Sequence, residues 1–74
     1  MECNERIRKI RIEKGLTQQF VADLLHVTQR TYADYESARI RIPLERLIEL
    51  ARFYDVSLEY LAAISKIRGN FPKY

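Results

Sequence analysis

The sequence predicts an all-α fold, a compact bundle of five short helices, from three observations. Apolar residues recur at helical spacing, and no segment alternates polar and apolar residues as a strand does. Ser and Thr residues stand where helix N-caps are expected. Only two glycines and two prolines occur, which favours regular elements joined by short connections.

A shared local pattern marks three of the helix starts. Thr17, Thr28 and Ser57 each follow an apolar residue and precede another apolar residue four positions later. The hydroxyl can accept a hydrogen bond from a free backbone N–H of the first turn, and the flanking apolar side chains pack together. The pattern predicts helices over residues 18–25, 29–36 and 58–66.

The remaining two helices are predicted from their ends and apolar positions. The first should span about residues 4–14 and end at Gly15, with Ile7 and Ile10 facing inward. The fourth should begin at Pro43, because a first helical position tolerates proline. Its buried stripe should consist of Leu44, Leu47, Leu50, Ala51 and Tyr54.

Composition indicates one small cytoplasmic domain. The 74 residues are 47% hydrophobic and 31% charged, which is typical of a globular chain. Cys3 is the single cysteine, so no internal disulfide is expected and a reducing compartment fits. The chain has no apolar run of the roughly 20 residues that a membrane span needs, and its start lacks a signal-peptide pattern. We expect a domain over residues 1–66 and an irregular basic tail over residues 67–74.

The second and third predicted helices are joined by a very short connection. Only residues 25–28 lie near their junction, too few for a relaxed antiparallel hairpin. Two helices joined this tightly cross at a steep angle, which is the helix-turn-helix arrangement. Small Ala22 stands where these helices would approach closely. Val27, Tyr32 and Tyr35 would fill the core beneath it.

A set of residues spread from the first helix to the fifth carries a resemblance to a known family. The set consists of Arg11, the turn Gly15-Leu16-Thr17-Gln18, Ala22, Val27-Thr28, Glu36 and the run LERLIELARFYDVSLEYL of residues 44–61. Any one of these would mean little alone, but together they are specific. From residue 5 to about residue 65 the chain resembles, without a gap, the phage-repressor and Cro type of helix-turn-helix regulators, also called Xre-like. The resemblance implies a lambda-repressor-like DNA-binding domain that regulates transcription, with repression favoured.

The resemblance implies that helix 29–36 enters the DNA major groove and contacts base edges. Residue by residue, it assigns this role to Gln29, Arg30, Thr31 and Asp34. Gln pairs well with adenine and Arg with guanine, whereas a carboxylate can accept from cytosine N4. Asp34 is the unusual member, because a carboxylate repels phosphates. It could read cytosine, orient Arg30 four positions earlier, or face elsewhere.

A second set of residues is expected to contact the phosphate backbone. Thr17 and Gln18 open a helix whose free N–H groups favour an anion, and by resemblance Gln18 also braces the recognition helix. Thr28 caps the recognition helix and could touch phosphate too. Arg39 and Arg41 follow in the loop where the family commonly contacts the DNA backbone.

The resemblance also implies one structural ion pair, and the chain departs from the family at three places. Arg11 and Glu36 are paired in the family, which ties the first helix to the end of the recognition helix. His26 stands at the turn where the family prefers glycine, and histidine enters the left-handed region at modest cost. Ser37-Ala38 replaces the Asn-Gly that often follows Glu36, and Pro43 comes later than the family's proline. The aim of the loop arginines is therefore left open.

Four apolar residues have no obvious place in a monomer. Ile40, Ile42, Phe53 and Phe71 could cover the core or form a dimer interface. A two-fold dimer would read an inverted-repeat operator of double-stranded DNA with half-sites about 34–36 Å apart.

Other function classes have less support. The charges of residues 16–42, which span the helix-turn-helix, balance to zero, and Asp34 adds a carboxylate to the recognition helix. These features leave open an antitoxin-like or adaptor module that uses the same fold for protein interaction. An enzymatic function has almost no support, because the lone His26 has no second metal ligand or nucleophile near it in the sequence. No cofactor, metal, small-molecule ligand or membrane partner is expected.

Overall fold

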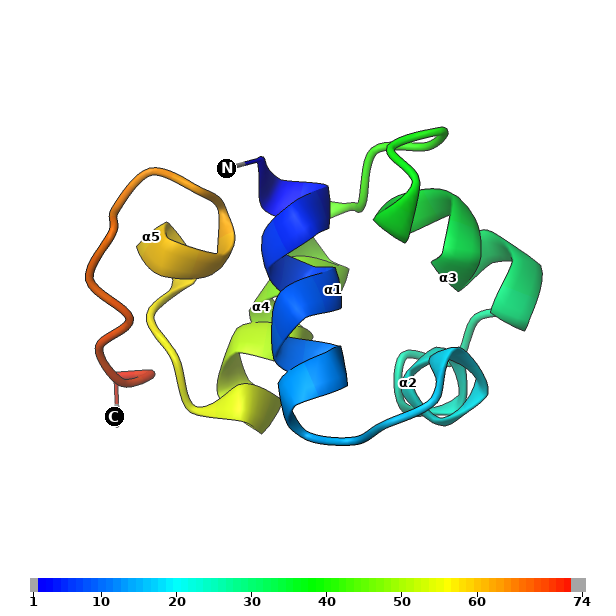
Figure 1. Cartoon of the computed structure of the whole chain (residues 1–74), viewed down its shortest axis with the longest axis horizontal. Coiled ribbons are helices and arrows are strands. Elements are labelled where there is room, and N and C mark those ends of the chain that lie inside the picture. Colours follow the sequence, from blue (N-terminus) through cyan, green and yellow to red (C-terminus); the bar gives the residue numbers. More distant parts are fainter. Residues whose placement is uncertain (1, 73–74) are drawn as a thin grey trace.

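The computed structural model describes residues 2–72, and five helices lie in this range. They are α1 (Cys3–Glu13), α2 (Gln18–Leu24), α3 (Gln29–Glu36), α4 (Leu44–Tyr54) and α5 (Leu58–Leu61). The described residues contain no strand, so the predicted all-α class is confirmed. Figure 1 shows α1 at the centre, with α2 and α3 on one side, α5 on the other and α4 behind.

The N-caps of α2, α3 and α5 are those that the sequence predicts. Each cap oxygen accepts a hydrogen bond from the backbone N–H three residues later, at 3.0 Å for Thr17 and 3.1 Å for Thr28 and Ser57. A cap of this kind contributes about 1 kcal/mol by satisfying a free N–H of the first turn. Local sequence therefore fixes where these three helices begin.

Each helix is followed by a residue with positive φ, which takes the chain out of the helix. These residues are Gly15 (70°), His26 (58°), Ala38 (63°), Asp55 (54°) and Ala63 (67°). The left-handed conformation suits glycine and costs other residues about 1–2 kcal/mol. The sequence marks the first two positions, but the two alanines carry no local signal for it.

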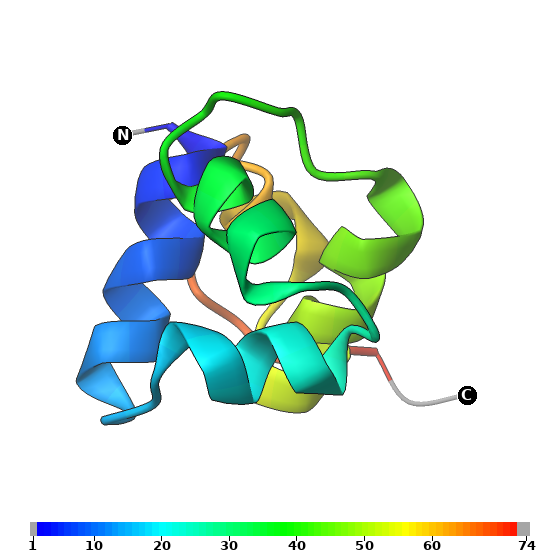
Figure 2. The same cartoon turned by 90° about the vertical axis from the view of Figure 1, so that its right-hand side faces the viewer.

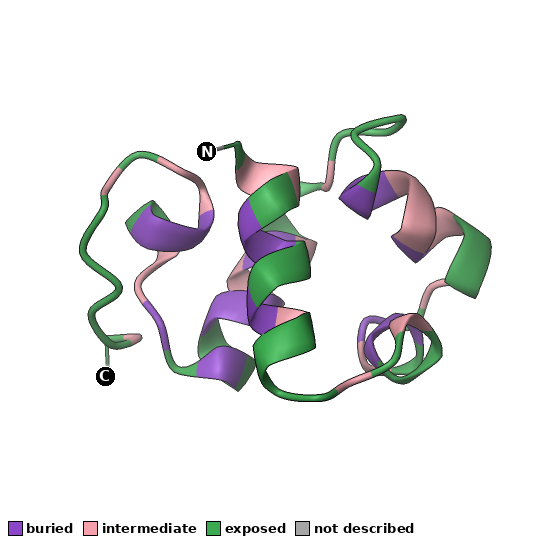
Figure 3. Cartoon of the chain, viewed as in Figure 1, coloured by how far each residue is buried: buried purple, intermediate pink, exposed green. Residues whose placement is uncertain are grey.

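The core lies where the helices face one another, and every helix contributes to it (Figure 3). Its largest fully buried side chains are Ile7, Ile10, Val21, Leu25, Tyr32, Leu50 and Leu61. Because α2 and α3 share this core with α1 and α4, the helix-turn-helix pair has a fixed position on the rest of the domain.

The prediction of a helix over residues 58–66 is wrong, because α5 ends at Leu61. Arg6 of α1 is buried and donates from Nη1 to the backbone carbonyls of Tyr60, at 2.7 Å, and of Ser65. Its guanidinium also lies 4.3 Å from the centre of the Tyr60 ring. Arg6 thus donates to the Tyr60 carbonyl, which in a longer helix would accept from the N–H of residue 64. Local helix propensity does not reveal these contacts.

The other predicted boundaries are within one residue or so of the observed ones. α4 begins at Leu44, one residue later than predicted, because Pro43 is extended, with ψ 149°, and serves as its N-cap. α1 begins at Cys3, where the backbone N–H of Glu2 donates to Glu5 Oε1 at 2.8 Å.

The segment after α5 is irregular but attached to the domain. The Arg68 carbonyl accepts from the Ser57 N–H at 2.9 Å, and Arg68 Nη1 lies 3.1 Å from Glu13 Oε1 of α1. The Phe71 N–H donates to Asp55 Oδ1 at 3.1 Å. Residues 73 and 74 of the predicted tail lie outside the described residues. Between residues 2 and 72 no helix is both long and apolar enough to cross a membrane.

Candidate nucleic-acid interface

The α2–α3 pair forms a tight turn with a steep crossing (Figure 2). The turn is made at His26, whose positive φ redirects the chain. The Val27 N–H then returns to the Ala22 carbonyl at 3.0 Å, and the Ala22 side chain is fully buried. A larger residue at position 22 would push the two helices apart, so the small side chain sets their close approach.

The N-terminal part of α3 presents free polar groups on its outer face. Gln29 and Arg30 are exposed, whereas Tyr32 and Tyr35 point into the core. Within residues 2–72, neither Gln29 nor Arg30 has a side-chain hydrogen bond or ion pair. Thr31 is half-buried, and its Oγ1 accepts from the Thr28 hydroxyl at 2.9 Å. Two of the four predicted base-contacting side chains are thus fully available to a ligand.

Asp34 differs from Gln29 and Arg30 in that its side chain is mostly buried and has a charged partner. Its side chain is only 18% exposed, and its Oδ1 is 4.0 Å from Nε of Arg39, in the loop after α3. The structure therefore brings Asp34 next to the loop and does not pair it with Arg30, which was one of the three alternatives for this residue.

The predicted phosphate-contacting residues are spread over two helix starts and one loop. Thr17 and Thr28 are exposed at the starts of α2 and α3, and Arg39 and Arg41 are exposed in the loop. Gln18 differs from them, because it is half-buried and donates from Nε2 to Glu36 Oε1 at 3.2 Å. It acts inside the domain as a brace between α2 and α3.

Glu36 is the centre of a buried polar cluster at the end of α3. Arg11 donates to it twice, from Nε to Oε2 at 2.6 Å and from Nη2 to Oε1 at 3.0 Å. The Tyr32 hydroxyl donates to Oε2 at 2.5 Å, and Asn4 Nδ2 donates to the Glu36 carbonyl at 3.1 Å. Sequence reasoning missed Tyr32 and Asn4 in this role. The four-residue spacing of Tyr32 and Glu36 on one helix was the available signal.

The cluster favours a charged Glu36. Burial alone would raise its pKa, but the hydrogen bonds from Arg11, Tyr32 and Gln18 outweigh burial and lower the pKa below its ordinary value. Burial and the nearby Glu36 carboxylate raise the pKa of Tyr32, so its hydroxyl keeps the proton that it donates. α1, α2 and α3 are therefore joined through one ionised carboxylate.

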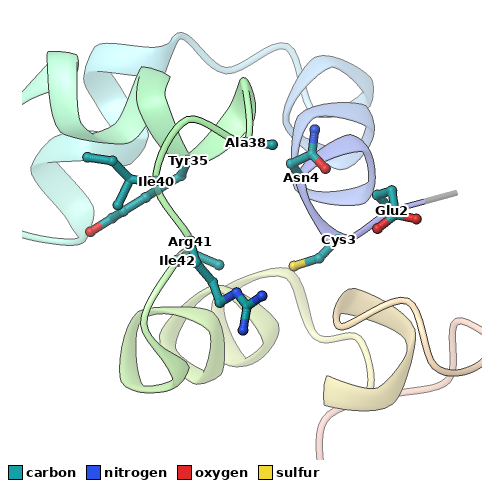
Figure 4. Close-up of a pocket in the computed structure, with 8 residues that line it drawn as sticks. All are labelled: Glu2, Cys3, Asn4, Tyr35, Ala38, Ile40, Arg41 and Ile42. Atoms are coloured by element: carbon teal, nitrogen blue, oxygen red, sulfur yellow. The ribbon is translucent and has the colours of Figure 1, made fainter.

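A cavity of about 250 Å³ separates the start of α1 from the loop between α3 and α4 (Figure 4). It is lined by Glu2, Cys3, Asn4, Tyr35, Ala38, Ile40, Arg41 and Ile42. Ile42 packs against the core, whereas Ile40 is 46% exposed. Cys3 is half-buried, and burial raises the pKa of its thiol. Of the two isoleucines in this loop, only Ile42 therefore attaches the loop to the core.

The four residues considered for a dimer interface lie near the two ends of α4. Ile40 and Ile42 precede α4, whereas Phe53 lies in its last turn, where its ring is 6.3 Å from that of Phe20. Phe71 packs against the core, with the Arg52 guanidinium 5.2 Å from its ring centre. The most exposed large apolar side chains, Ile64 at 79% and Ile67 at 77%, lie in the segment after α5.

The comparison with known proteins identifies the fold. Residues 7–61 match the helix-turn-helix family. The chain belongs to this family. The crossing of α2 and α3 and the relatives below, which include a phage repressor, agree with the phage-repressor type that the sequence resembles.

Several relatives of this helix-turn-helix chain are transcriptional regulators. The chain is 34% identical over 65 residues to the uncharacterized HTH-type transcriptional regulator YobD of Bacillus subtilis (strain 168), covering 88% of this chain and 57% of YobD. It is 35% identical over 69 residues to the HTH-type transcriptional regulator AnsR of the same organism, covering 93% and 60%. It is 35% identical over 63 residues to the cryptic phage CTXphi transcriptional repressor RstR of Vibrio cholerae, covering 85% and 57%.

A solved structure has the same fold. The crystal structure of a transcriptional regulator from Listeria innocua superimposes with a TM-score of 0.82 at 31% identity, covering 88% of this chain and 61% of that one. The chain therefore spans between 57% and 61% of the length of these relatives.

Proposed function

We propose that this chain binds double-stranded DNA sequence-specifically and regulates transcription, with repression as its mode of action. The observation that carries the proposal is the outer face of α3, where Gln29 and Arg30 are exposed and unpaired within the described residues. They stand on the second helix of a helix-turn-helix whose position is fixed by the buried Glu36 cluster. An exposed polar helix start on a rigid support is what major-groove reading requires.

In the proposed complex, α3 lies in the major groove with its N-terminal turn toward the base edges. Gln29 would read adenine through N6 and N7, and Arg30 would read guanine through O6 and N7. Each good bidentate pair contributes about 1–3 kcal/mol of discrimination against the wrong base. Thr31 lies beside them, and because its Oγ1 accepts from the Thr28 hydroxyl, its own O–H stays free to donate to a base edge.

Contacts to the phosphates would fix the register of α3 in the groove. We assign these contacts to the exposed Thr17, Thr28, Arg39 and Arg41. Gln18 belongs to this set as well, through the second N–H of the amide that braces Glu36. Each neutralised phosphate releases a counterion, so log affinity should fall with log salt at a slope near −0.9 per phosphate contact.

The proposed functional form is a homodimer on an inverted repeat. α3 has eight residues and can reach only a few base pairs from its first turn. Two copies related by a two-fold axis would double the recognised sequence and place half-sites about 34–36 Å apart. Sedimentation with and without a selected duplex tests this part, and one protomer per duplex at saturation would contradict it.

Selection from random duplexes, followed by salt titration on the selected sequence, tests the proposed function. The expected result is an enriched palindrome that is bound with a steep negative salt slope. If the protein instead bound every duplex equally, or bound none at moderate ionic strength, the proposal would be overturned. The absence of binding would favour the alternative of a protein-interaction module.

A further inference from the structure

We infer that Asp34 acts in DNA binding as a positioning residue for Arg39 and reads no base. The inference rests on the proposed function, because it assigns a role to Arg39 at the DNA backbone. Its basis is that residue 34 contacts the loop residue Arg39 through both its main chain and its side chain.

The main-chain contact ties the start of the loop to α3. The Asp34 carbonyl accepts from the Arg39 N–H at 2.9 Å and from the Ile40 N–H at 3.2 Å. The Ser37 hydroxyl donates to the same carbonyl at 3.3 Å. The backbone of Arg39 therefore has a defined place beside α3, although its side chain is 71% exposed.

The side chains form an ion pair that is too long for a hydrogen bond, and its attraction favours guanidinium directions near α3. Asp34 Oδ1 lies 4.0 Å from Arg39 Nε, so the carboxylate faces the Nε edge of the group. A guanidinium has five N–H donors in a planar fork, and the Nη edge opposite the carboxylate stays free. A phosphate could then be bound by that free edge, in the two-bond geometry that arginine favours with oxyanions.

The position of Asp34 argues against direct base reading. Its side chain is 18% exposed, whereas Gln29 and Arg30 on the same helix are exposed and unpaired within the described residues. A carboxylate directed at the groove without a cation beside it would repel the phosphates on both sides. Next to Arg39, its charge is compensated and it limits the directions that the arginine can take.

A double-mutant cycle between Asp34 and Arg39, with the wild type as its reference, tests the inference. The variants are Asp34→Asn, Arg39→Gln and the combination, each measured on the duplex selected by the wild type and on an unrelated duplex of equal length. Asp34→Asn should weaken binding to both duplexes about two- to fivefold, which corresponds to the free energy that an exposed ion pair contributes. The preferred bases should not change. In the Arg39→Gln background, Asp34→Asn should cause no further loss.

Asp23→Asn is the matched control for removing a negative charge. Asp23 is exposed on α2, and its carboxylate accepts from Gln19 Nε2 at 2.8 Å, with no arginine partner among the described residues. This variant should not reproduce the loss seen for Asp34→Asn. Thermal unfolding of all variants separates a change in binding from a change in folding.

Three results would overturn the inference while leaving the proposed function intact. They are a changed base preference in Asp34→Asn, an equal loss in the presence and absence of Arg39, and tighter binding of Asp34→Asn to both duplexes. If the wild type bound no duplex at all, the proposed function and the inference would both fall.

Discussion

Arg11 of α1 and Glu36 of α3 form a two-bond ion pair across 25 residues of sequence, with donor–acceptor distances of 2.6 Å and 3.0 Å. The pair is nearly inaccessible, since the side chains are 13% and 3% exposed. Arg11 Nη1 also donates to the Leu16 carbonyl at 2.8 Å, just before α2. The three helices that determine the position of the recognition face are therefore joined at one point.

Glu36→Gln should lower the free energy of unfolding by about 2 kcal/mol, because it removes the charge that Arg11, Gln18 and Tyr32 all address. Urea unfolding measures this loss. The matched control is Glu49→Gln, which breaks a partly exposed pair with Arg46 at 2.5 Å and should cost less than about 1 kcal/mol. Equal losses for the two variants would contradict the structural role of Glu36.

The stability contributed by Glu36 should depend on pH in the acid range. Its pKa is lower in the folded protein than its ordinary value of 4.5, so this contribution is present above that value and is lost as pH falls through the folded pKa. The difference in unfolding free energy between the wild type and Glu36→Gln should therefore stay constant from pH 7 to about pH 5 and shrink below about pH 4. A difference that grew on acidification would have the wrong sign.

Two buried tyrosine hydroxyls should respond differently to removal. The Tyr32 hydroxyl donates to Glu36, so Tyr32→Phe should cost about 1–2 kcal/mol of unfolding free energy. The Tyr54 hydroxyl is buried with no hydrogen-bond partner among residues 2–72, and burial raises its pKa to about 12. Tyr54→Phe should leave stability unchanged or increase it. The same urea titrations compare the two, and a larger cost at position 54 would contradict the geometry.

Ala38→Gly should stabilise the protein. Ala38 has a φ of 63°, a conformation that costs an alanine about 1–2 kcal/mol and glycine almost nothing. After the greater entropy of glycine in the unfolded chain is subtracted, a gain of about 0.5–1 kcal/mol remains. Ala33→Gly, in the middle of α3, is the opposite control and should cost about 1 kcal/mol. A loss at both positions would show that the backbone of Ala38 is not strained.

Much of the fold follows from local sequence signals. Thr17, Thr28 and Ser57 act as N-caps because a hydroxyl at that position satisfies the first turn wherever the helix later packs. The spacing of Tyr32 and Tyr35 defined the inner face of α3, and hence the outward face that carries Gln29 and Arg30. These signals need no knowledge of distant contacts.

What the sequence could not provide depends on contacts between distant segments. No local signal marks Arg6 for burial, yet it is buried against Tyr60 and donates to the backbone carbonyls of Tyr60 and Ser65. The end of α5 could not be predicted, because Ala62 and Ala63 favour helix locally. The partner of Asp34 depended on the shape of the loop, which the Ser37-Ala38 departure from the family had left open.

The most direct test of the central claim, that α3 reads bases through its N-terminal face, is the base preference of Arg30→Ala in a selection from random duplexes. The account predicts that preference relaxes at one base pair of each half-site, by about 1–3 kcal/mol, while the other positions keep theirs. Arg39→Ala serves as the comparison and should weaken all sequences alike. An Arg30→Ala protein that lost affinity uniformly and kept the wild-type preference would contradict the account.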